Sequence, residues 1–301
     1  MAVVGVTVSE QRDFPQELRV LERNNTLVPI SSADLKEKMA HCDILYLWDL
    51  AYDHLYEALL DAPTGSLSSI YVARQGKDQK LQEICQGKGV KIAYAENVFS
   101  DTIAEYAAVS LMMLSKNLHI TASQKKWDKQ YNLPIAGSTA LLLGRGSISQ
   151  QLKKVLLSMG VVADSIGRET VLEISTGRVE AAYGKRLSLI DHIVCCLPHD
   201  SITSGVLGIN FFSYFKNANF VNVSRGAVLN IADLISAIDK SYVRAALLDA
   251  FTEEPLKPSS RLWSDDRIVV SPHQAYRSWD WAKRLHSSFI DYLNSSNDKM
   301  N

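Results

Sequence analysis

The stretch ALLLGRGSISQQLKKVLLSM, residues 140–159, places a two-glycine loop between a short apolar run and an amphipathic pattern. We expect residues 140–143 to form a strand and residues 148–159 to form a helix, because the apolar side chains of the second segment recur at helical spacing. A glycine loop between a strand and a helix is typical of dinucleotide-binding folds, in which the pyrophosphate lies against the helix N-terminus. The segment therefore predicts a nucleotide site.

The glycine loop contains the first candidate cofactor contacts. Gly144 and Gly146 occupy the first two glycine positions of the dinucleotide pattern, which serve a tight turn and a close backbone approach to the pyrophosphate. Ser149 replaces the third glycine, and its small side chain is compatible with close packing of the helix against the strand. The loop residues that we expect to bind the cofactor are Gly144, Arg145, Gly146, Ser147 and Ile148.

Strand-like and helix-like segments alternate over the rest of the chain. The expected strands are residues 2–8, 26–30, 43–47, 69–73 and 90–94, and then residues 161–166, 192–197, 220–223, 245–248 and 268–270. The other expected helices are residues 32–39, 77–86, 101–118, 211–215, 231–238 and 280–293. Strands separated by helices form parallel sheets, so we predict an α/β fold. The long helix at 101–118 is apolar over much of its circumference, so we expect it to be buried both between the domains and against a second subunit.

The composition is that of an ordinary globular protein. The 301 residues include 47% hydrophobic and 22% charged residues, and the formal net charge is -1. Because no basic excess is present to neutralise phosphates, we expect neither a nucleic acid nor a membrane surface as a partner. We recognise no signal peptide and no run of about 20 apolar residues, and the four cysteines form no Cys-x-x-Cys pair. We therefore expect a cytoplasmic protein with reduced thiols.

Three polar residues form a candidate catalytic set. Arg225 lies in the sequence NVSRGA, Glu254 in DAFTEEPL and His273 in SPHQA. Arginine can grip a carboxylate with two hydrogen bonds, and histidine can exchange a proton near neutral pH while a neighbouring carboxylate supports its protonated form. An anion clamp and a carboxylate-supported acid are what the reduction of a 2-oxo acid requires. The other histidines lack the spacing of metal ligands, so we expect no metal site.

The choice of cofactor depends on the end of the strand at residues 161–166. An acidic residue there would bind the ribose hydroxyls of NAD, whereas a basic residue would bind the 2′-phosphate of NADP. Asp164 is within counting range of the glycine loop but falls inside the strand, while Gly167 and Arg168 follow its end. We therefore favour NADP(H) over NAD(H), with Gly167 and Arg168 as cofactor contacts. The adjacent Glu169 leaves an alternative open, because it could neutralise Arg168 or take the ribose.

Several short motifs in a fixed order resemble the D-isomer-specific 2-hydroxyacid dehydrogenases, in particular hydroxypyruvate and glyoxylate reductases. The matching segments are IAEY at 103–106, the glycine loop, CLPH at 196–199, NVSRG at 222–226, DAF at 249–251, EPL at 254–256, LW at 262–263 and PH at 272–273. The resemblance implies a Rossmann dinucleotide-binding domain, residues 98–277, inserted into a smaller flavodoxin-like α/β substrate domain formed by residues 1–97 and 278–301. It also implies reduction of a 2-oxo acid to a D-2-hydroxy acid with NAD(P)H, and a homodimer whose interface includes the long helix.

The resemblance also assigns roles to single residues. Arg225 would bind the substrate carboxylate and polarise its carbonyl, His273 would deliver the proton, and Glu254 would support His273. Backbone N–H groups at Gln75 and Gly76 would hold the substrate carboxylate from the substrate domain. The remaining residues that match cofactor contacts are Thr102, Leu197, Pro198, Val223 and Asp249.

Several departures from the family pattern and several alternative interpretations stay open on the sequence alone. Thr102 could instead cap a helix, Asp249 could brace the turn before Glu254, and Asn97 stands where relatives have a turn glycine. An NAD(P)(H)-sensing interaction protein on the same fold is the alternative function, although the complete catalytic set argues against it. Formate or phosphite as hydride donor would also use an anion clamp. Hydroxypyruvate, glyoxylate, pyruvate and branched or aromatic 2-oxo acids all fit an arginine clamp.

Overall fold

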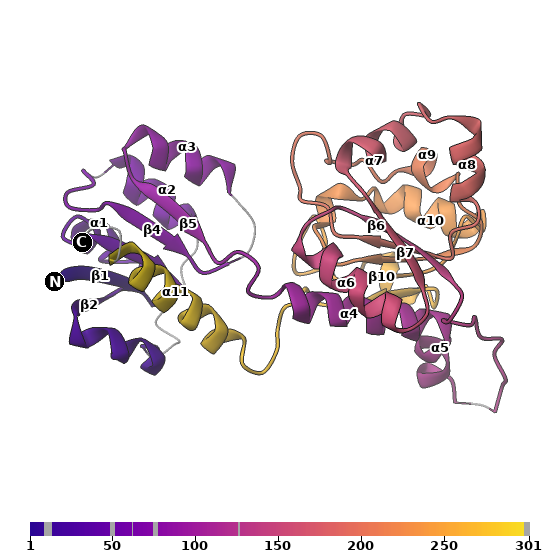
Figure 1. The fold of residues 1–301 in the computed structure, drawn as a ribbon, viewed down its shortest axis with the longest axis horizontal. Helices are drawn as coiled ribbons and strands as arrows, with labels where there is room; N and C mark the ends of the chain where they lie inside the picture. The colour runs from indigo at the N-terminus through magenta and orange to yellow at the C-terminus, as the bar shows by residue number, and fades with distance from the viewer. Residues whose placement is uncertain (9–13, 49–51, 62, 75–77, 126, 298–301) are drawn as a thin grey trace. The chain divides into compact units, whose positions relative to one another are not determined.

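Two compact units make up the structure, a computed structural model that describes residues 1–8, 14–48, 52–61, 63–74, 78–125 and 127–297. The terminal unit consists of Met1–Val98 and Trp279–Asn301, so it contains both ends of the chain. The central unit is the single segment Phe99–Ser278. Figure 1 shows that each unit has its own sheet covered by helices.

The terminal unit is built on a five-stranded parallel sheet in the order β2-β1-β3-β4-β5. Its strands are β1 (Ala2–Thr7), β2 (Asn25–Ile30), β3 (Ile44–Leu47), β4 (Ser69–Val72) and β5 (Lys91–Tyr94). Its helices are the 3₁₀ helix η1 (Gln16–Arg23) and the α-helices α1 (Leu35–Met39), α2 (Tyr52–Asp61), α3 (Gln79–Gly87) and α11 (Trp281–Asn297). This strand order is that of flavodoxin-like folds.

The last helix, α11, lies beside the sheet of the terminal unit (Figure 1). Aromatic side chains attach it to the strands. Phe289 stacks on Tyr46 of β3 with 4.2 Å between ring centroids, and the Tyr46 hydroxyl is 2.9 Å from Nδ1 of His286. Tyr71 of β4 contacts Phe289 and forms a 2.6 Å hydrogen bond with Ser288. Tyr46 and Phe289 are fully buried, so the end of the chain completes the core that its beginning forms.

The central unit contains a six-stranded parallel sheet in the order β11-β10-β9-β8-β6-β7. Its strands are β6 (Thr139–Leu143), β7 (Val162–Ile166), β8 (His192–Cys195), β9 (Ala218–Asn222), β10 (Val243–Leu248) and β11 (Ile268–Val270). Its helices are α4 (Ser100–Ser115), α5 (Leu118–Ser123), α6 (Ser147–Ser158), α7 (Arg168–Ser175), α8 (Ala181–Leu187), α9 (Ile209–Phe212), α10 (Ile231–Asp239) and the 3₁₀ helices η2 (Gly226–Val228) and η3 (Arg261–Ser264).

The strand order places a topological switch point between β6 and β8, where the chain changes direction across the sheet. Doubly wound sheets bind their ligands at such a point, beyond the carboxyl ends of the strands. Figure 1 shows α4 and α6 on one face of the sheet and α7, α9 and α10 on the other. Every residue of β8 and β9 is buried, as expected for strands covered on both faces. The predicted α/β class with parallel sheets is confirmed.

Some helices differ from the sequence prediction. The patterns did not predict η1, α2, α5, α7 or α8; in α8, for example, Leu187 is the one buried residue, so no apolar stripe marks the helix. The long helix α4 ends at Ser115 rather than at residue 118, because Asn117 adopts φ 51° and turns the chain before α5 begins. Asparagine tolerates this left-handed conformation at helix ends better than most residues.

A partly buried cation holds the end of α4. Arg244 leaves the regular pairing of β10 with β9 and donates hydrogen bonds to Asn219 Oδ1 at 3.0 Å and Asn117 Oδ1 at 2.9 Å. It also donates to the carbonyl of Leu114 in the last turn of α4. Burial lowers the pKa of Arg244, but the partial negative charge at a helix C-terminus favours a cation there. Arg244 therefore links the sheet to the end of the long helix.

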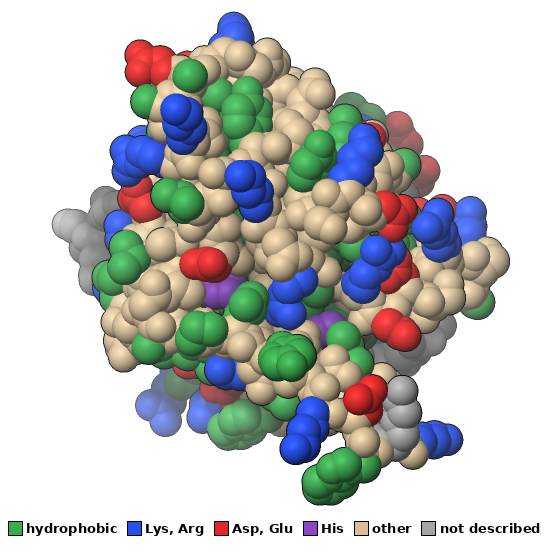
Figure 2. All heavy atoms as spheres, turned by 90° about the vertical axis from the view of Figure 1, so that its right-hand side faces the viewer, with side chains coloured by type: hydrophobic (Ala, Val, Ile, Leu, Met, Phe, Trp, Pro, Cys, Tyr) green, Lys and Arg blue, Asp and Glu red, His purple; other side chains and the backbone are tan. Residues whose placement is uncertain are grey.

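Charged groups of both signs are interspersed on the face of the molecule that Figure 2 shows. This mixture is consistent with the formal net charge of -1. Among the residues that the structure describes, no helix has the length and the apolar composition needed to cross a membrane.

Two buried histidines predict a loss of stability in acid. His192 and His286 are 1% and 2% exposed, and burial lowers the pKa of each from 6.5 to about 4. Between pH 6.5 and 4 the unfolded chain binds protons that the folded chain excludes, so the free energy of unfolding falls as the pH falls. We expect a loss of roughly 2 kcal/mol per histidine between pH 7 and 5.

Chemical denaturation at pH 7 and pH 5 measures this effect. His192→Gln should remove the share of the pH dependence that His192 contributes, roughly 2 kcal/mol, because glutamine does not titrate. His41→Gln is the matched control, since His41 is exposed. Equal stability of the wild type at the two pH values would contradict the assignment.

Candidate active site

Predicted site residues follow all six strands of the central sheet at their carboxyl ends. The glycine loop follows β6, Gly167 and Arg168 follow β7, and Leu197 and Pro198 follow β8. Val223 and Arg225 follow β9, Asp249 follows β10, and His273 follows β11. Because the sheet is parallel, these ends share one edge. The fold therefore gathers residues from positions 144 to 273 along a single edge of the central unit.

The backbone at the end of β6 requires glycine at position 144. Gly144 has φ 118°, and its N–H donates to the carbonyl of Ile166 in β7 at 2.8 Å. A Cβ at this position would lie 2.9 Å from the carbonyl oxygen of Cys196. Both the left-handed region and the close neighbouring backbone exclude a side chain. The backbone conformation and the packing of the protein, rather than a bound ligand, therefore require glycine at position 144.

Gly146 has a different environment. It is the N-cap of α6, with φ -74°, and a Cβ there would meet no atom within 4 Å. The open space lies at the N-terminus of a twelve-residue helix, where backbone N–H groups attract anions such as a pyrophosphate. Ser147 in the first turn forms a 2.7 Å hydrogen bond with Ser100 at the start of α4, and Ser149 is buried at 1% exposure. These residues fit a dinucleotide pyrophosphate.

Alanine at the two glycine positions should separate folding from cofactor binding. Gly144→Ala should lower the melting temperature of the free protein, since Cβ meets backbone there. Gly146→Ala should leave that temperature nearly unchanged and weaken NAD(P)H binding by about tenfold, the factor that 1.4 kcal/mol represents. Thermal unfolding and cofactor titration measure the two effects. A Gly146→Ala variant with wild-type cofactor affinity would contradict the assignment of the pyrophosphate to this loop.

The end of β7 carries charged groups of both signs. Gly167 is the N-cap of α7, and Arg168 is the first residue of that helix. The Arg168 guanidinium lies 2.5 Å from Asp200 and 3.1 Å from Glu169. The Arg145 guanidinium also lies here, 3.8 Å from where a Cβ of Gly167 would be. Two arginines therefore stand at the position where an adenosine ribose is expected.

Asp164 does not lie at the end of β7, where an acidic residue would bind the ribose hydroxyls. It lies inside β7, as the sequence indicated, and its exposed carboxylate is 3.6 Å from Nζ of Lys153 on α6.

The loop after β8 packs on the hydrophobic core of the central unit. Leu197 is 2% exposed and belongs to the hydrophobic cluster of the central unit, whereas Pro198 is exposed. Thr203 donates a 2.7 Å hydrogen bond to the Pro198 carbonyl, which fixes the loop. Val223 after β9 is also buried, at 6% exposure. Contacts of Leu197 and Val223 with a cofactor would therefore use the backbone.

Arg225 is held by its neighbours in the turn after β9. Asn222 accepts a hydrogen bond from the Ser224 N–H at 3.0 Å and donates to the Arg225 carbonyl at 3.3 Å. The Arg225 N–H donates to Ser224 Oγ at 2.5 Å. The arginine itself is exposed, and its guanidinium donates to the Ser224 carbonyl at 2.9 Å. The turn is fixed while the cation faces outward.

Gly226 joins this turn to the next loop along the sheet edge. A Cβ at Gly226 would lie 1.9 Å from the carbonyl carbon of Phe251 and 2.2 Å from the nitrogen of Thr252. No side chain fits in that space. The close approach brings the turn of Arg225 against the loop that carries Glu254.

Glu254 and His273 form a direct pair. Oε2 of Glu254 is 2.8 Å from Nδ1 of His273, and Oε1 accepts the Phe251 N–H at 2.8 Å. Both side chains are about one-third exposed. An ionised carboxylate can only accept, so Nδ1 carries a proton and Nε2 is left to exchange one. The pair has the chemistry of an oriented acid or base.

Asp249 braces the turn that carries His273. Its carboxylate is 1% exposed and accepts hydrogen bonds from Ser271 Oγ at 2.5 Å and from the N–H groups of Gln274 and Ala275 at 3.0 Å each. Ser271 is in turn 2.6 Å from the Tyr106 hydroxyl on α4. A bracing role was one of the two interpretations for Asp249, although the turn that it holds is the one with His273. The sequence carried no signal for Tyr106.

Gln75 and Gly76 lie outside the described residues. Thr102 lies in the first turn of α4, whose N-cap is Phe99, so the interpretation of Thr102 as the helix cap is wrong.

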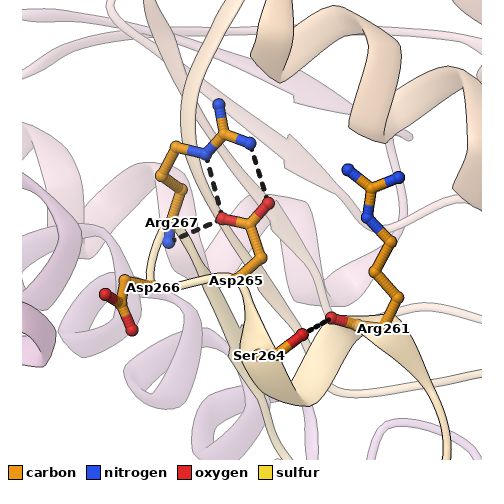
Figure 3. Close-up of a pocket in the computed structure, with 5 residues that line it drawn as sticks. All are labelled: Arg261, Ser264, Asp265, Asp266 and Arg267. Atoms are coloured by element: carbon orange, nitrogen blue, oxygen red, sulfur yellow. Dashed lines mark hydrogen bonds and ion pairs between the residues drawn. The ribbon is translucent and has the colours of Figure 1, made fainter.

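A shallow depression of about 420 Å³ beside η3 contains none of the predicted residues. Arg261, Ser264, Asp265, Asp266 and Arg267 line it. Figure 3 shows that Arg267 and Asp265 face each other, joined by hydrogen bonds of 2.8 and 2.9 Å. The charges of Arg267 and Asp265 are therefore paired with each other and not presented to a ligand. No group of three or more His, Cys, Asp and Glu side chains among the described residues could hold a metal ion.

Comparison with known proteins identifies the family. The model of the D-isomer specific 2-hydroxyacid dehydrogenase, NAD binding domain, matches residues 106–275. The chain belongs to this family. A glyoxylate reductase/hydroxypyruvate reductase from Mus musculus is 30% identical over 267 residues, covering 84% of this chain and 80% of the relative. A glyoxylate/hydroxypyruvate reductase A from Photorhabdus laumondii is 26% identical over 247 residues, covering 78% and 77%.

Solved structures support the fold of this family member. The crystal structure of a glyoxylate reductase from Paecilomyes thermophila aligns with a TM-score of 0.80 at 16% identity, covering 98% of this chain and 95% of that one. The predicted family is thus confirmed, and so is the Rossmann-like fold. This 2-hydroxyacid dehydrogenase is an oxidoreductase that uses a nicotinamide cofactor and a small-molecule substrate.

Proposed function

We propose that the protein reduces a 2-oxo acid to a D-2-hydroxy acid, with Arg225 binding the carboxylate and His273 donating the proton. The observation that carries the proposal is the 2.8 Å pair between His273 and Glu254, in the same unit as the turn of Arg225. The close backbone approach at Gly226, which leaves no room for a Cβ, holds the loops of Arg225 and Glu254 against each other. A clamp and an oriented acid thus come from one rigid edge of the sheet.

The chemistry follows from these side chains. Arg225 would place its planar fork on the substrate carboxylate and beside the carbonyl oxygen, where negative charge develops. His273 would donate from Nε2 to that oxygen, while Glu254 holds Nδ1 and stabilises the cationic ring. The nicotinamide supplies the hydride when bound. Asp249 and Ser271 keep the turn of His273 in place.

We also propose that the cofactor site favours NADP(H) over NAD(H). The support is the presence of Arg168 and Arg145 beyond β7, where a 2′-phosphate would lie. Asp164, the acidic residue at the sequence distance from the glycine loop expected for NAD, lies inside β7 and pairs with Lys153 on α6. The cofactor contacts that complete the proposal are Thr102, Gly144, Gly146, Ser147, Ile148, Gly167, Leu197, Pro198, Val223 and Asp249.

The experiment that tests the function follows nicotinamide absorbance with the purified protein, using NADPH and NADH in parallel. The panel contains glyoxylate and hydroxypyruvate, after the names of the relatives, together with pyruvate and branched and aromatic 2-oxo acids. Oxidation of the cofactor with any of these acids supports the proposal, and the product is then assigned as D or L with a chiral column. Cofactor binding without turnover on the whole panel would refute it and favour a nucleotide-sensing role.

A homodimer in the cytoplasm completes the proposal. The segment after α5 exposes Trp127 and Tyr131 almost fully, at 97% and 98%, and Val109 and Leu118 of α4 and α5 are more than half exposed. Apolar side chains gathered on one segment are typical of a subunit interface. Sedimentation should therefore give twice the 33.5 kDa chain mass, and Trp127→Ser with Tyr131→Ser should shift it toward the monomer. A monomeric wild type would contradict this part.

A further inference from the structure

An ion pair crosses the candidate cofactor site beside the glycine loop. Arg168 follows β7 and Asp200 follows β8, and β6 lies between these two strands in the sheet. The Arg168 guanidinium nevertheless reaches Oδ2 of Asp200 at 2.5 Å. The pair therefore passes over the carboxyl end of β6, where the glycine loop begins. This is the edge at which a doubly wound sheet holds the adenosine ribose.

The two oxygens of Asp200 have separate tasks. Oδ1 accepts hydrogen bonds from the N–H groups of Ile202 and Thr203, both at 2.9 Å, and so fixes the turn after β8. Oδ2 is the oxygen that pairs with Arg168. Burial opposes ionisation, yet the hydrogen bonds from Thr203, Ile202 and Arg168 keep the pKa of Asp200 below its usual value. At neutral pH Asp200 is therefore ionised, and its position beside the Arg168 guanidinium is fixed by the turn.

The charges around Arg168 balance. Glu169 lies 3.1 Å from the same guanidinium but is 71% exposed, whereas Asp200 is 28% exposed. Arg145 contributes a second cation nearby, beside Gly167. The guanidinium groups of the two arginines and the two carboxylates therefore lie together at the end of β7. A 2′-phosphate carries about two negative charges and would meet both the arginine and the carboxylate that already holds it.

We propose that Asp200 is a specificity-determining residue that reduces the preference for NADP(H) conferred by Arg168 and Arg145, by competing with the 2′-phosphate for Arg168. The inference rests on the proposed assignment of this edge to the adenosine ribose. A ribose without the 2′-phosphate leaves the Arg168–Asp200 pair intact, so NAD(H) binds without breaking it. NADP(H) must displace Asp200 from the guanidinium or lie against its charge. Asp200 therefore sets the ratio of the two affinities, and Arg168 alone does not.

Asp200→Asn tests the proposal, because an asparagine oxygen can still accept the two N–H groups of the turn while the charge is removed. The full-length protein is titrated with NADPH and NADH, and with the fragments 2′,5′-ADP and 5′-AMP, by calorimetry. We expect Asp200→Asn to tighten NADPH and 2′,5′-ADP by about three- to tenfold. Affinities for NADH and 5′-AMP should change by less than about twofold. Arg168→Gln should abolish the gain when combined with Asp200→Asn.

Glu169→Gln is the matched control, since it removes the other carboxylate from the same guanidinium. Its exposed position predicts a smaller shift than that of Asp200→Asn. An unchanged ratio of NADPH to NADH affinity in Asp200→Asn, or equal weakening of both nucleotides, would overturn the inference and leave Asp200 as a turn cap. An equal shift in Glu169→Gln would overturn the assignment to Asp200. A wild type that binds neither nucleotide would refute the proposed function itself, and the inference with it.

Discussion

Replacing His273 with glutamine is expected to lower kcat for 2-oxo acid reduction by about 10²- to 10⁴-fold, the range that a positioned proton donor contributes. Glutamine keeps a polar side chain that can hydrogen-bond, but it cannot transfer a proton at neutral pH. Glu254 holds Nδ1 of His273 at 2.8 Å, so Nε2 is the atom that would reach the carbonyl oxygen. We expect the KM for the oxo acid to change less than kcat, because Arg225 still binds the carboxylate.

Steady-state kinetics at saturating cofactor measure this change. His41→Gln, an exposed histidine of the terminal unit, is the control for the same substitution away from the site. Cofactor titration of the His273→Gln variant shows whether the central unit still folds and binds. Turnover close to that of the wild type would remove His273 from the proposed mechanism.

Arg225→Lys is the second substitution with a large expected effect. Lysine retains the positive charge but loses the planar fork that grips a carboxylate through two hydrogen bonds. We expect kcat/KM to fall by about 10²- to 10³-fold, with KM rising and kcat falling together. Both change because the same guanidinium would bind the ground-state carboxylate and the oxygen on which charge develops.

Arg261→Lys provides the matched control, since Arg261 is an exposed arginine of η3 in the same unit. The kinetics are measured over a wide range of oxo acid concentrations, so that KM and kcat separate. Unaltered kinetics in Arg225→Lys would exclude a bidentate clamp. A change in KM alone would reduce Arg225 to a binding role without a part in stabilising the developing charge.

The local features of the glycine loop could be predicted from the sequence. The strand, loop and helix at residues 140–159 follow from periodicity, and the structure places β6 and α6 there. Gly144 adopts φ 118°, which is a property of the local backbone and so favours glycine in the sequence. Asn97, noted as a replacement for a turn glycine, has φ 64°. Asparagine tolerates that region better than most residues, so the turn survives the substitution.

Other helices and several long-range contacts could not be predicted from the sequence pattern. Helices such as α8 bury too few side chains to produce a periodic pattern. The brace of Asp249 on the turn of His273 joins residues 25 and 26 positions apart. The hydroxyl of Tyr106 reaches Ser271 across 165 positions. The spacing of residues in the sequence does not predict such pairs, because the pairs depend on which loops the sheet brings together.

The sequence by itself determined the α/β class, the glycine loop, the family and the candidate set of Arg225, Glu254 and His273. These follow from periodicity, local backbone conformation and the order of motifs, all of which are properties of neighbouring residues. Only the tertiary structure decided that Asp200 neutralises Arg168 from 32 positions away, and that Gly226 has no room for a side chain beside Phe251. Electrostatic balance and close packing depend on distances in space, and these exist only once the parallel strands have aligned their carboxyl ends.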